Sequence, residues 1–373
     1  MSVLNPKCFQ INYLQDIRTD TGARDLLMLE RCVLALELVG RLRQYGLDFV
    51  FKGGTSLLLH LSEPKRLSID VDILCLDQGK LPEVLDKVVS ERPFHRWRHL
   101  KNLDRMNPPT VHYAVDFDSV VNPEQPFYVM IDVLAAENPY ASLNQKELNT
   151  GFVEPVESIH LHLPSVSSLL GDKLAAFAPG TIGFPYQRNS RKGEALPPMP
   201  GYVVKHLYDL GQISVLAENL SETNLTYDRI HAEQCAWRGF HEKNACLNDT
   251  QDAARFASLV SDYQKKSPDG KIEFFRQGIK FVQSHMFQEP FGREAVRIAS
   301  GRVALLAEIV RQNATEHSLK HLLQAGVDRE EIKRHTLTGI WADLEALKKT
   351  DPQAYMLWVR TQGMQGPQIL DVD

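Results

Sequence analysis

The sequence contains no long apolar segment. No run within its 373 residues reaches the roughly 18 apolar residues that a membrane-spanning helix needs. The N-terminal stretch Met1–Asn5 also lacks the basic residues and apolar block of a secretory signal. We therefore expect a protein without a membrane segment that works in the cytoplasm.

Cysteine is scarce, and positive charge is not in excess. The five cysteines are never closer than eleven residues apart, which suits neither a disulfide framework nor a zinc cluster. A net charge of −5 argues against a protein that coats nucleic acid through bulk charge, although it allows a local basic patch. The long glycine spacings of the P-loop and of the dinucleotide fold are also missing.

The hydrophobic content of 43% and the length are sufficient for a full core, and they favour two domains. In the first part of the chain, helical and alternating apolar patterns predict a mixed core. The expected helices cover Ala23–Gly46, Thr55–Leu61 and Leu81–Val89, and the expected strands cover Asp48–Phe51, Leu67–Leu76, Val111–Val115 and Phe127–Leu134.

Beyond about residue 156 the apolar period is helical throughout. The expected helices include Ser165–Phe177, Tyr202–Ala217, Tyr227–Phe240 and Asp249–Lys265. Pro179–Gly201, with nine prolines and glycines, predicts either a mobile substrate loop or a disordered linker. We expect an α+β protein with an α/β core over 1–155, a helical domain over 156–313 and a helical extension over 314–373.

Asp70 and Asp72 are the first candidates for chemistry. Carboxylates two residues apart on a strand project from one face, roughly 7 Å apart at the backbone. Two-metal phosphoryl transfer uses such a pair to hold divalent cations about 3.5–4 Å apart. The alternative is an ordinary solvated strand face.

A glycine turn lies sixteen residues before this pair. Gly53 and Gly54 allow the backbone to approach a ligand, and a following helix start offers unpaired N–H groups to a phosphate. Thr55 or Ser56 can add a hydroxyl donor. A phosphate cradle and a carboxylate pair are needed together for nucleotide transfer from a triphosphate, although most Gly-Gly pairs are only turns.

Asp132 and Lys173 are further candidates because each is a charge in an apolar pattern. Asp132 is the only charge in Tyr128–Leu134, and a buried charge needs a partner. It is expected to be a third metal ligand or the general base, unless it faces water at a strand edge. Lys173 falls on the buried stripe of its helix, where it either reaches a phosphate or extends along its stem to solvent.

The segments Phe51–Leu57 and Arg66–Ile73 resemble the nucleotidyltransferase AbiEii/AbiGii toxin family. That family has a Lys-Gly-Gly-Thr turn, a short helix and an Arg-x-Ser-x-Asp-x-Asp strand in this order. The resemblance continues more weakly at Asp172–Ala176 and Lys205–Leu210, and it covers roughly residues 25–290. One departure is His206, where family members commonly carry a second acidic residue.

The resemblance implies a polymerase-β-like nucleotidyltransferase core and a helical domain, with a nucleoside triphosphate between them and Mg²⁺ or Mn²⁺ as cofactor. It implies a nucleotide-binding set of Lys52, Gly53, Gly54, Thr55, Ser56, Arg66, Ser68 and Lys173. It also places Asp209 in the last active-site motif. The helical projection, by contrast, puts Asp209 on the polar face near Lys205, where an exposed ion pair is the simpler interpretation.

Members of this family are toxins of toxin–antitoxin or phage-defence systems, and some transfer nucleotides to RNA such as the tRNA acceptor end. The resemblance therefore implies an antitoxin partner and an RNA acceptor. The basic and aromatic segment Arg92–Arg105 suits RNA contact, although a charged sheet edge explains it as well. A non-catalytic nucleotide-binding module and a small-molecule transferase, for example one acting on an antibiotic, are the alternatives.

Overall fold

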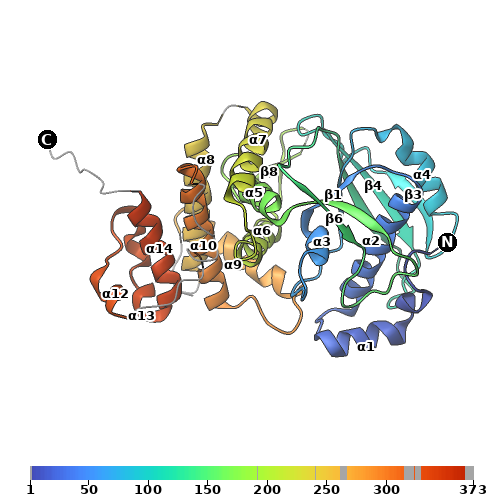
Figure 1. Cartoon of the computed structure of the whole chain (residues 1–373), viewed down its shortest axis with the longest axis horizontal. Helices are drawn as coiled ribbons and strands as arrows, with labels where there is room; N and C mark the ends of the chain where they lie inside the picture. Colours follow the sequence, from blue (N-terminus) through green and yellow to red (C-terminus); the bar gives the residue numbers. More distant parts are fainter. Residues whose placement is uncertain are drawn as a thin grey trace. The chain divides into compact units, whose positions relative to one another are not determined.

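The computed structural model describes residues 2–190, 192–239, 241–260, 267–314, 323 and 329–365. The chain divides into two compact units (Figure 1). The first comprises Met1–Ser165 and Ser284–Pro290, and the second comprises Val166–Gln283 and Phe291–Asp373. The first unit contains a mixed sheet with helices and the second is mainly helical, so the predicted α+β class is confirmed.

A seven-stranded mixed sheet with the order β3-β4-β5-β2-β1-β7-β6 forms the centre of the first unit. β2 pairs in parallel with β5, β1 pairs in parallel with β7, and the other neighbours are antiparallel. The strands are β1 (Val50–Lys52), β2 (Val71–Leu74), β3 (Phe94–His99), β4 (Thr110–Phe117), β5 (Phe127–Leu134), β6 (Leu143–Glu147) and β7 (His160–Pro164).

The long helix α2 (Leu26–Gln44) packs against β2 and β5 and contributes to the apolar core of this unit. It begins where the Asp25 side chain accepts hydrogen bonds from the Leu27 and Met28 amides, which satisfies two free donors of the first turn. The other helices are α1 (Ile11–Thr21), α3 (Gly53–Ser56), α4 (Leu81–Val88) and the 3₁₀ turns Pro6–Phe9, Leu57–Leu59 and Gln78–Lys80.

The strand predicted over Leu67–Leu76 is shorter in the structure. Only Val71–Leu74 forms the ladder, so Asp72 lies within β2 and Asp70 lies just before it. The reason is that the preceding backbone has other partners. The Leu67 amide donates to the His285 carbonyl, and the Asp70 carbonyl accepts from the Thr55 hydroxyl.

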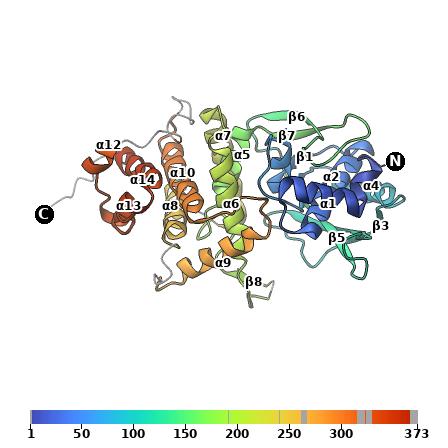
Figure 2. The ribbon, with the colours of Figure 1, turned by 90° about the horizontal axis from the view of Figure 1, so that it is seen from below.

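The second unit consists mainly of helices, which Figure 2 shows from a second direction. They are α5 (Val166–Ala176), α6 (Pro200–Ile213), α7 (Leu220–Arg238), α8 (Lys243–Leu259), α9 (Lys271–Gln283), α10 (Arg293–Arg311), α12 (Arg329–Arg334), α13 (Leu347–Thr350), α14 (Pro352–Met364) and the 3₁₀ turn Gly339–Leu344. Phe240, the predicted helix end at 261–265 and much of the expected 314–373 extension lie outside the described residues.

One expectation for the middle of the chain is wrong. The helical pattern does not begin at 156, because His160–Pro164 is strand β7. Within Pro179–Gly201, β8 (Arg188–Asn189) pairs with β9 (Ala195–Leu196), and the role of this stretch as a mobile substrate loop stays a prediction. Its start is also anchored, since the Asp249 carboxylate accepts hydrogen bonds from the Gly180 amide at 2.7 Å and the Thr181 hydroxyl at 3.0 Å.

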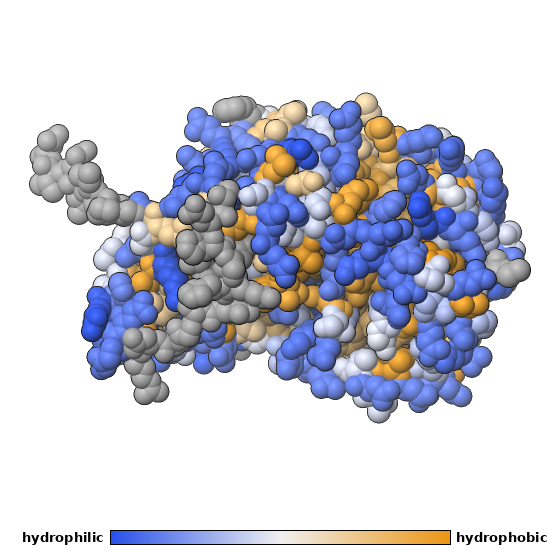
Figure 3. Space-filling model, viewed as in Figure 1, coloured by the Kyte–Doolittle hydropathy of each residue, from blue (hydrophilic) through white to orange (hydrophobic). Residues whose placement is uncertain are grey.

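Within the described residues, no helix is both long and apolar enough to cross a membrane. On the face drawn in Figure 3, hydrophilic residues cover much of the surface and hydrophobic ones show in patches among them.

Candidate functional site

One residue from each of four neighbouring strands lies in a single cross-strand row. Lys52 is opposite Asp72, Asp72 is opposite Asp132, and Asp132 is opposite His112. Residues directly opposite each other on paired strands project from the same face of a sheet. The fold of the first unit therefore gathers these four side chains on one face, although 60 residues separate Asp72 from Asp132 in the sequence.

The environment of Asp132 disfavours its charge. Burial and, after it, the nearby carboxylates of Asp72 and Asp70 raise the pKa of Asp132 to about 8, while Lys52 acts in the opposite direction. One carboxyl oxygen, Oδ1, is buried without a hydrogen-bond partner. The nearest ring nitrogen, His112 Nε2, lies 3.6 Å from it. Asp132 is thus a half-buried strand residue with two carboxylates nearby, and its side chain is 29% exposed.

The glycine turn lies directly against the row of Lys52, Asp72, Asp132 and His112, which we call the acidic row. Gly53 has φ +76°, and a Cβ atom at this position would overlap the carboxylate of Asp72. At Gly54 a Cβ atom would lie 2.9 Å from both Arg66 Nη2 and Ser68 Oγ. Only glycine allows so close an approach at both positions. The turn and the Arg-x-Ser-x-Asp-x-Asp segment are therefore packed together, as the resemblance implied.

The hydroxyl groups that follow the turn are buried and help to hold it. Thr55 donates to the Asp70 carbonyl at 2.5 Å and lies 3.0 Å from the Ser68 hydroxyl. Ser56 donates to the Gly53 carbonyl at 3.0 Å. The buried Arg66 guanidinium donates to the Leu67 carbonyl at 2.9 Å. These contacts fix the turn beside Asp70, and contact of these residues with a nucleotide stays a prediction.

Lys173 and Asp209 form a buried ion pair in the second unit. Lys173 Nζ lies 2.8 Å from Asp209 Oδ2, and the two side chains are only 3% and 4% exposed. The expectation of an exposed Asp209 paired with Lys205 is wrong, because α5 covers the face of α6 that carries Asp209. Extension of Lys173 along its stem to solvent is also wrong. A triphosphate contact of Lys173 stays a prediction.

The basic segment Arg92–Arg105 is largely paired with acids of its own unit. Arg96 and Arg98 both bind the Asp116 carboxylate, each with a nitrogen–oxygen distance of 2.7 Å, and Arg92 pairs with Asp118. Residues Phe94–His99 of the segment form β3, which is an edge strand. These contacts favour the alternative explanation, a sheet edge protected by charge.

His112 and its partner Asp104 are residues that the sequence analysis missed. The Asp104 carboxylate accepts the His112 amide at 3.0 Å, and its other oxygen lies 2.7 Å from His99 Nε2. Burial lowers the pKa of His112 despite its acidic neighbours. The available signal was the alternation of the predicted strand, but alternation alone does not reveal which strand lies beside Asp132.

The chemistry of the acidic row suits a divalent cation. Carboxylate oxygens are the ligands that Mg²⁺ and Mn²⁺ prefer, and Asp132 offers an oxygen with no hydrogen-bond partner. A cation there would offset the repulsion that raises the pKa of Asp132. As the side chains stand, no three His, Cys, Asp or Glu residues in the described part of the chain are gathered closely enough to form a metal cluster. A cation would therefore have to draw the carboxylates together.

An acidic row beside a glycine turn is an arrangement suited to phosphoryl-group transfer. Comparison with known families agrees, since residues 38–295 match the model for the nucleotidyl transferase AbiEii toxin, described as a type IV TA system. This match spans more than half of the chain, and the chain belongs to that family. It is a toxin-family nucleotidyltransferase, for which the family implies a nucleoside triphosphate substrate and an antitoxin.

No curated protein sequence matches the chain. Among solved structures, one similar chain is MenT4, a nucleotidyltransferase toxin from Mycobacterium tuberculosis H37Rv. The similarity has a TM-score of 0.41 and 14% sequence identity, and it covers 94% of this chain and 98% of that one.

Proposed function

We propose that this chain transfers a nucleoside monophosphate from a nucleoside triphosphate to a hydroxyl group of RNA, with Mg²⁺ or Mn²⁺ bound by Asp70, Asp72 and Asp132. The RNA is expected to be a tRNA and the setting a toxin–antitoxin or phage-defence system of the cytoplasm. One observation carries the proposal. The row of Lys52, Asp72 and Asp132 lies against the Gly53 turn, which suits a carboxylate cluster and a phosphate cradle used together.

In this mechanism the backbone amides at Gly53 and Gly54 hold the triphosphate, and the missing Cβ atoms let the Asp72 carboxylate, Arg66 and Ser68 lie directly beside them. The acceptor oxygen forms a bond to the α-phosphorus, the bond from that phosphorus to the bridging oxygen breaks, and pyrophosphate leaves. When bound, the cation neutralises charge on the phosphates and lowers the pKa of the acceptor hydroxyl. Asp132 either completes the cation site or accepts the proton of the hydroxyl.

The test is transfer of label from α-³²P nucleoside triphosphates to total RNA by the purified chain with Mg²⁺. Asp70→Asn and Asp72→Asn should each reduce transfer by about 10²-fold or more, because the cation site loses a ligand. Asp48→Asn is the matched control. Its side chain is 91% exposed and lies just before β1, so transfer should be unchanged.

Either of two results would favour a different function. Binding of nucleoside triphosphate with no labelled RNA or protein would identify a non-catalytic binding module. Label on a small molecule but not on RNA would identify a small-molecule transferase, which would share the same acidic row. If Asp48→Asn reduced transfer as strongly as Asp72→Asn, the assignment of the row as the active centre would be wrong.

A further inference from the structure

A cavity of about 630 Å³ lies within the second unit, among α8, α9 and α10. This volume is in the range of ligand-binding cavities. The cavity is lined by Ala257, Ser258, Val260, Arg276, Ile279, Lys280, Gln283, Phe291, Gly292, Arg293, Val296 and Arg297. Four of these residues are cationic and none is acidic, in a protein whose net charge is −5.

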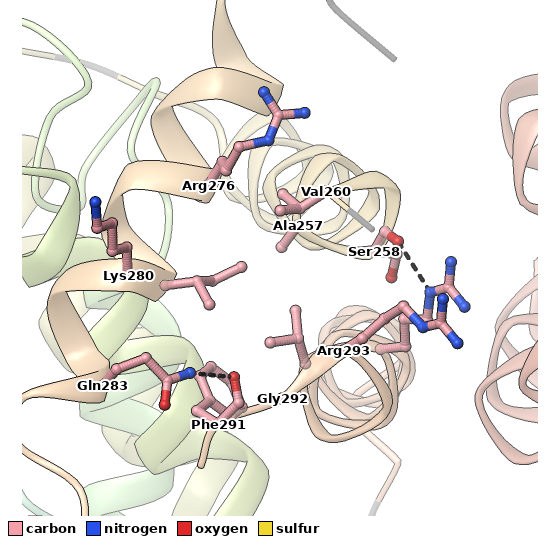
Figure 4. A pocket seen from close by; sticks show the side chains of 12 residues that line it. Ala257, Ser258, Val260, Arg276, Lys280, Gln283, Phe291, Gly292 and Arg293 are labelled. Carbon is pink, nitrogen blue, oxygen red and sulfur yellow. Dashed lines mark hydrogen bonds between the residues drawn. The ribbon is translucent and has the colours of Figure 1, made fainter. Parts of the chain in front are cut away.

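The cationic side chains lie around the apolar residues that line the cavity. Arg276 and Lys280 lie one turn apart on α9, and Figure 4 shows Arg293 on the opposite side of the cavity. Ala257 and Val260 lie between these helices in the same view. The Gln283 amide donates to the Phe291 carbonyl at 2.7 Å, which ties the end of α9 to the approach to α10. This contact between α9 and α10 involves no acidic residue.

The cations of the cavity differ in how much charge they leave for a ligand. Arg297 is paired with Asp351, and its Nε donates to the Ser258 carbonyl, so its charge is largely offset. Lys280 and Arg293 are exposed, and neither has a hydrogen bond or ion pair with any residue that the structure describes. These two residues supply most of the uncompensated positive charge of the rim.

The positions of these cations are unfavourable for the helices themselves. Like charges four residues apart, as at Arg276 and Lys280, destabilise a helix. Arg293 occupies the first position of α10, where the helix dipole repels a cation and Gly292 supplies no side-chain cap, while Glu294 in the same turn acts in the opposite direction. A bound anion would relieve both effects.

We propose that this cavity binds single-stranded RNA, with phosphates at Lys280, Arg293 and Arg276 and a base or ribose on its apolar lining residues. Three cations on two helices match a chain of single phosphates better than one multiply charged group. Arginine also pairs well with phosphate oxygens because of its planar, forked donors. RNA binding at this cavity does not depend on the proposed function. Only the role of the bound RNA as the acceptor rests on it.

Binding is measured by fluorescence anisotropy of a labelled, unstructured ten-nucleotide RNA, without nucleoside triphosphate or divalent cation. Lys280→Ala with Arg293→Ala should weaken binding by about tenfold or more. The slope of log K against log salt should become shallower by about 1.4, since each phosphate contact on a single strand contributes about 0.7. Neither side chain makes a described internal contact, so the fold should be retained.

The matched control is Lys80→Ala with Lys333→Ala, which removes the same number of charges from exposed positions that do not line the cavity. It should bind RNA as the unmodified protein does. Equal RNA binding by the cavity variant and the control would overturn the proposal. Competition by polyglutamate as strong as that by RNA would also overturn it, in favour of an acidic protein partner. Competition by a mononucleotide as strong as that by RNA would instead indicate a free nucleotide.

Failure of this inference and failure of the proposed function give different results. If RNA binding requires Lys280 and Arg293 but no label is ever transferred, the cavity proposal stands and the transferase proposal falls. If transfer occurs and the cavity variant binds RNA normally, the transferase proposal stands and the cavity proposal falls.

Discussion

At the scale of single residues, Asp132 shows how the fold changes the chemistry of a carboxyl group. Burial, with Asp72 and Asp70 nearby, raises its pKa from 3.8 to about 8. The unfolded chain ionises this group near pH 4, so folding opposes ionisation between about pH 4 and pH 8. The stability that the neutral group contributes is complete below pH 4 and is lost as the pH rises through 8.

We therefore predict that Asp132→Asn stabilises the protein at pH 8 in the absence of divalent cations. The gain in the free energy of unfolding should be about 1–3 kcal/mol, allowing for the partial exposure of the side chain, and should shrink toward pH 4. Urea unfolding across this pH range measures it, with Asp48→Asn as the control. A gain that is equal at every pH would contradict the assigned pKa.

Gly53 provides a second test at this scale. Gly53→Ala should cost about 1–3 kcal/mol of stability, because alanine is strained at φ +76°, and should abolish nucleotide transfer because its Cβ displaces the Asp72 carboxylate. Gly46→Ala separates the two effects. Gly46 has φ +84°, but a Cβ atom there meets nothing within 4 Å. The Gly46→Ala variant should lose a similar free energy of unfolding and keep nucleotide transfer. Urea unfolding measures the first effect and the labelling assay the second.

At the scale of elements, α5 and α6 are joined by the buried pair of Lys173 and Asp209. Removing one partner leaves an uncompensated buried charge, whereas removing both does not. Lys173→Met should lower the free energy of unfolding by about 3–5 kcal/mol, and adding Asp209→Leu should recover a substantial part of this loss. Denaturant unfolding of the single and double variants measures the difference.

The same double variant separates a structural pair from a functional one. If Lys173 contacts the triphosphate, the double variant should recover stability while nucleotide transfer stays absent. Recovery of transfer together with stability would show that the pair serves only to join the two helices.

At the scale of the whole molecule, the two units have separate compact cores. Compact units of this kind often unfold as separate transitions. We predict two transitions in calorimetry. Gly53→Ala should lower the midpoint of one and Lys173→Met the midpoint of the other. A single transition that both substitutions shift equally would show that the units unfold together.

Local patterns in the sequence were sufficient for much of the first unit. The apolar spacing over Ala23–Gly46 indicates α2, and the apolar run Phe127–Leu134 matches β5 at both ends. The glycine pair and the Asp70 and Asp72 spacing indicate the turn and the acidic strand. These features depend on residues close together in the chain, so periodicity and turn chemistry reveal them.

Contacts between distant segments were decided only by the tertiary structure. The register of β4 against β5 places His112 opposite Asp132, and no periodicity encodes register between strands. The burial of Asp209 depends on α5, which a projection of α6 alone does not include. β2 begins late because Leu67 and Asp70 have partners elsewhere in the first unit. The sequence by itself thus determined which groups are candidates for the chemistry, and folding decided their neighbours, because side-chain environment depends on segments far apart in the chain.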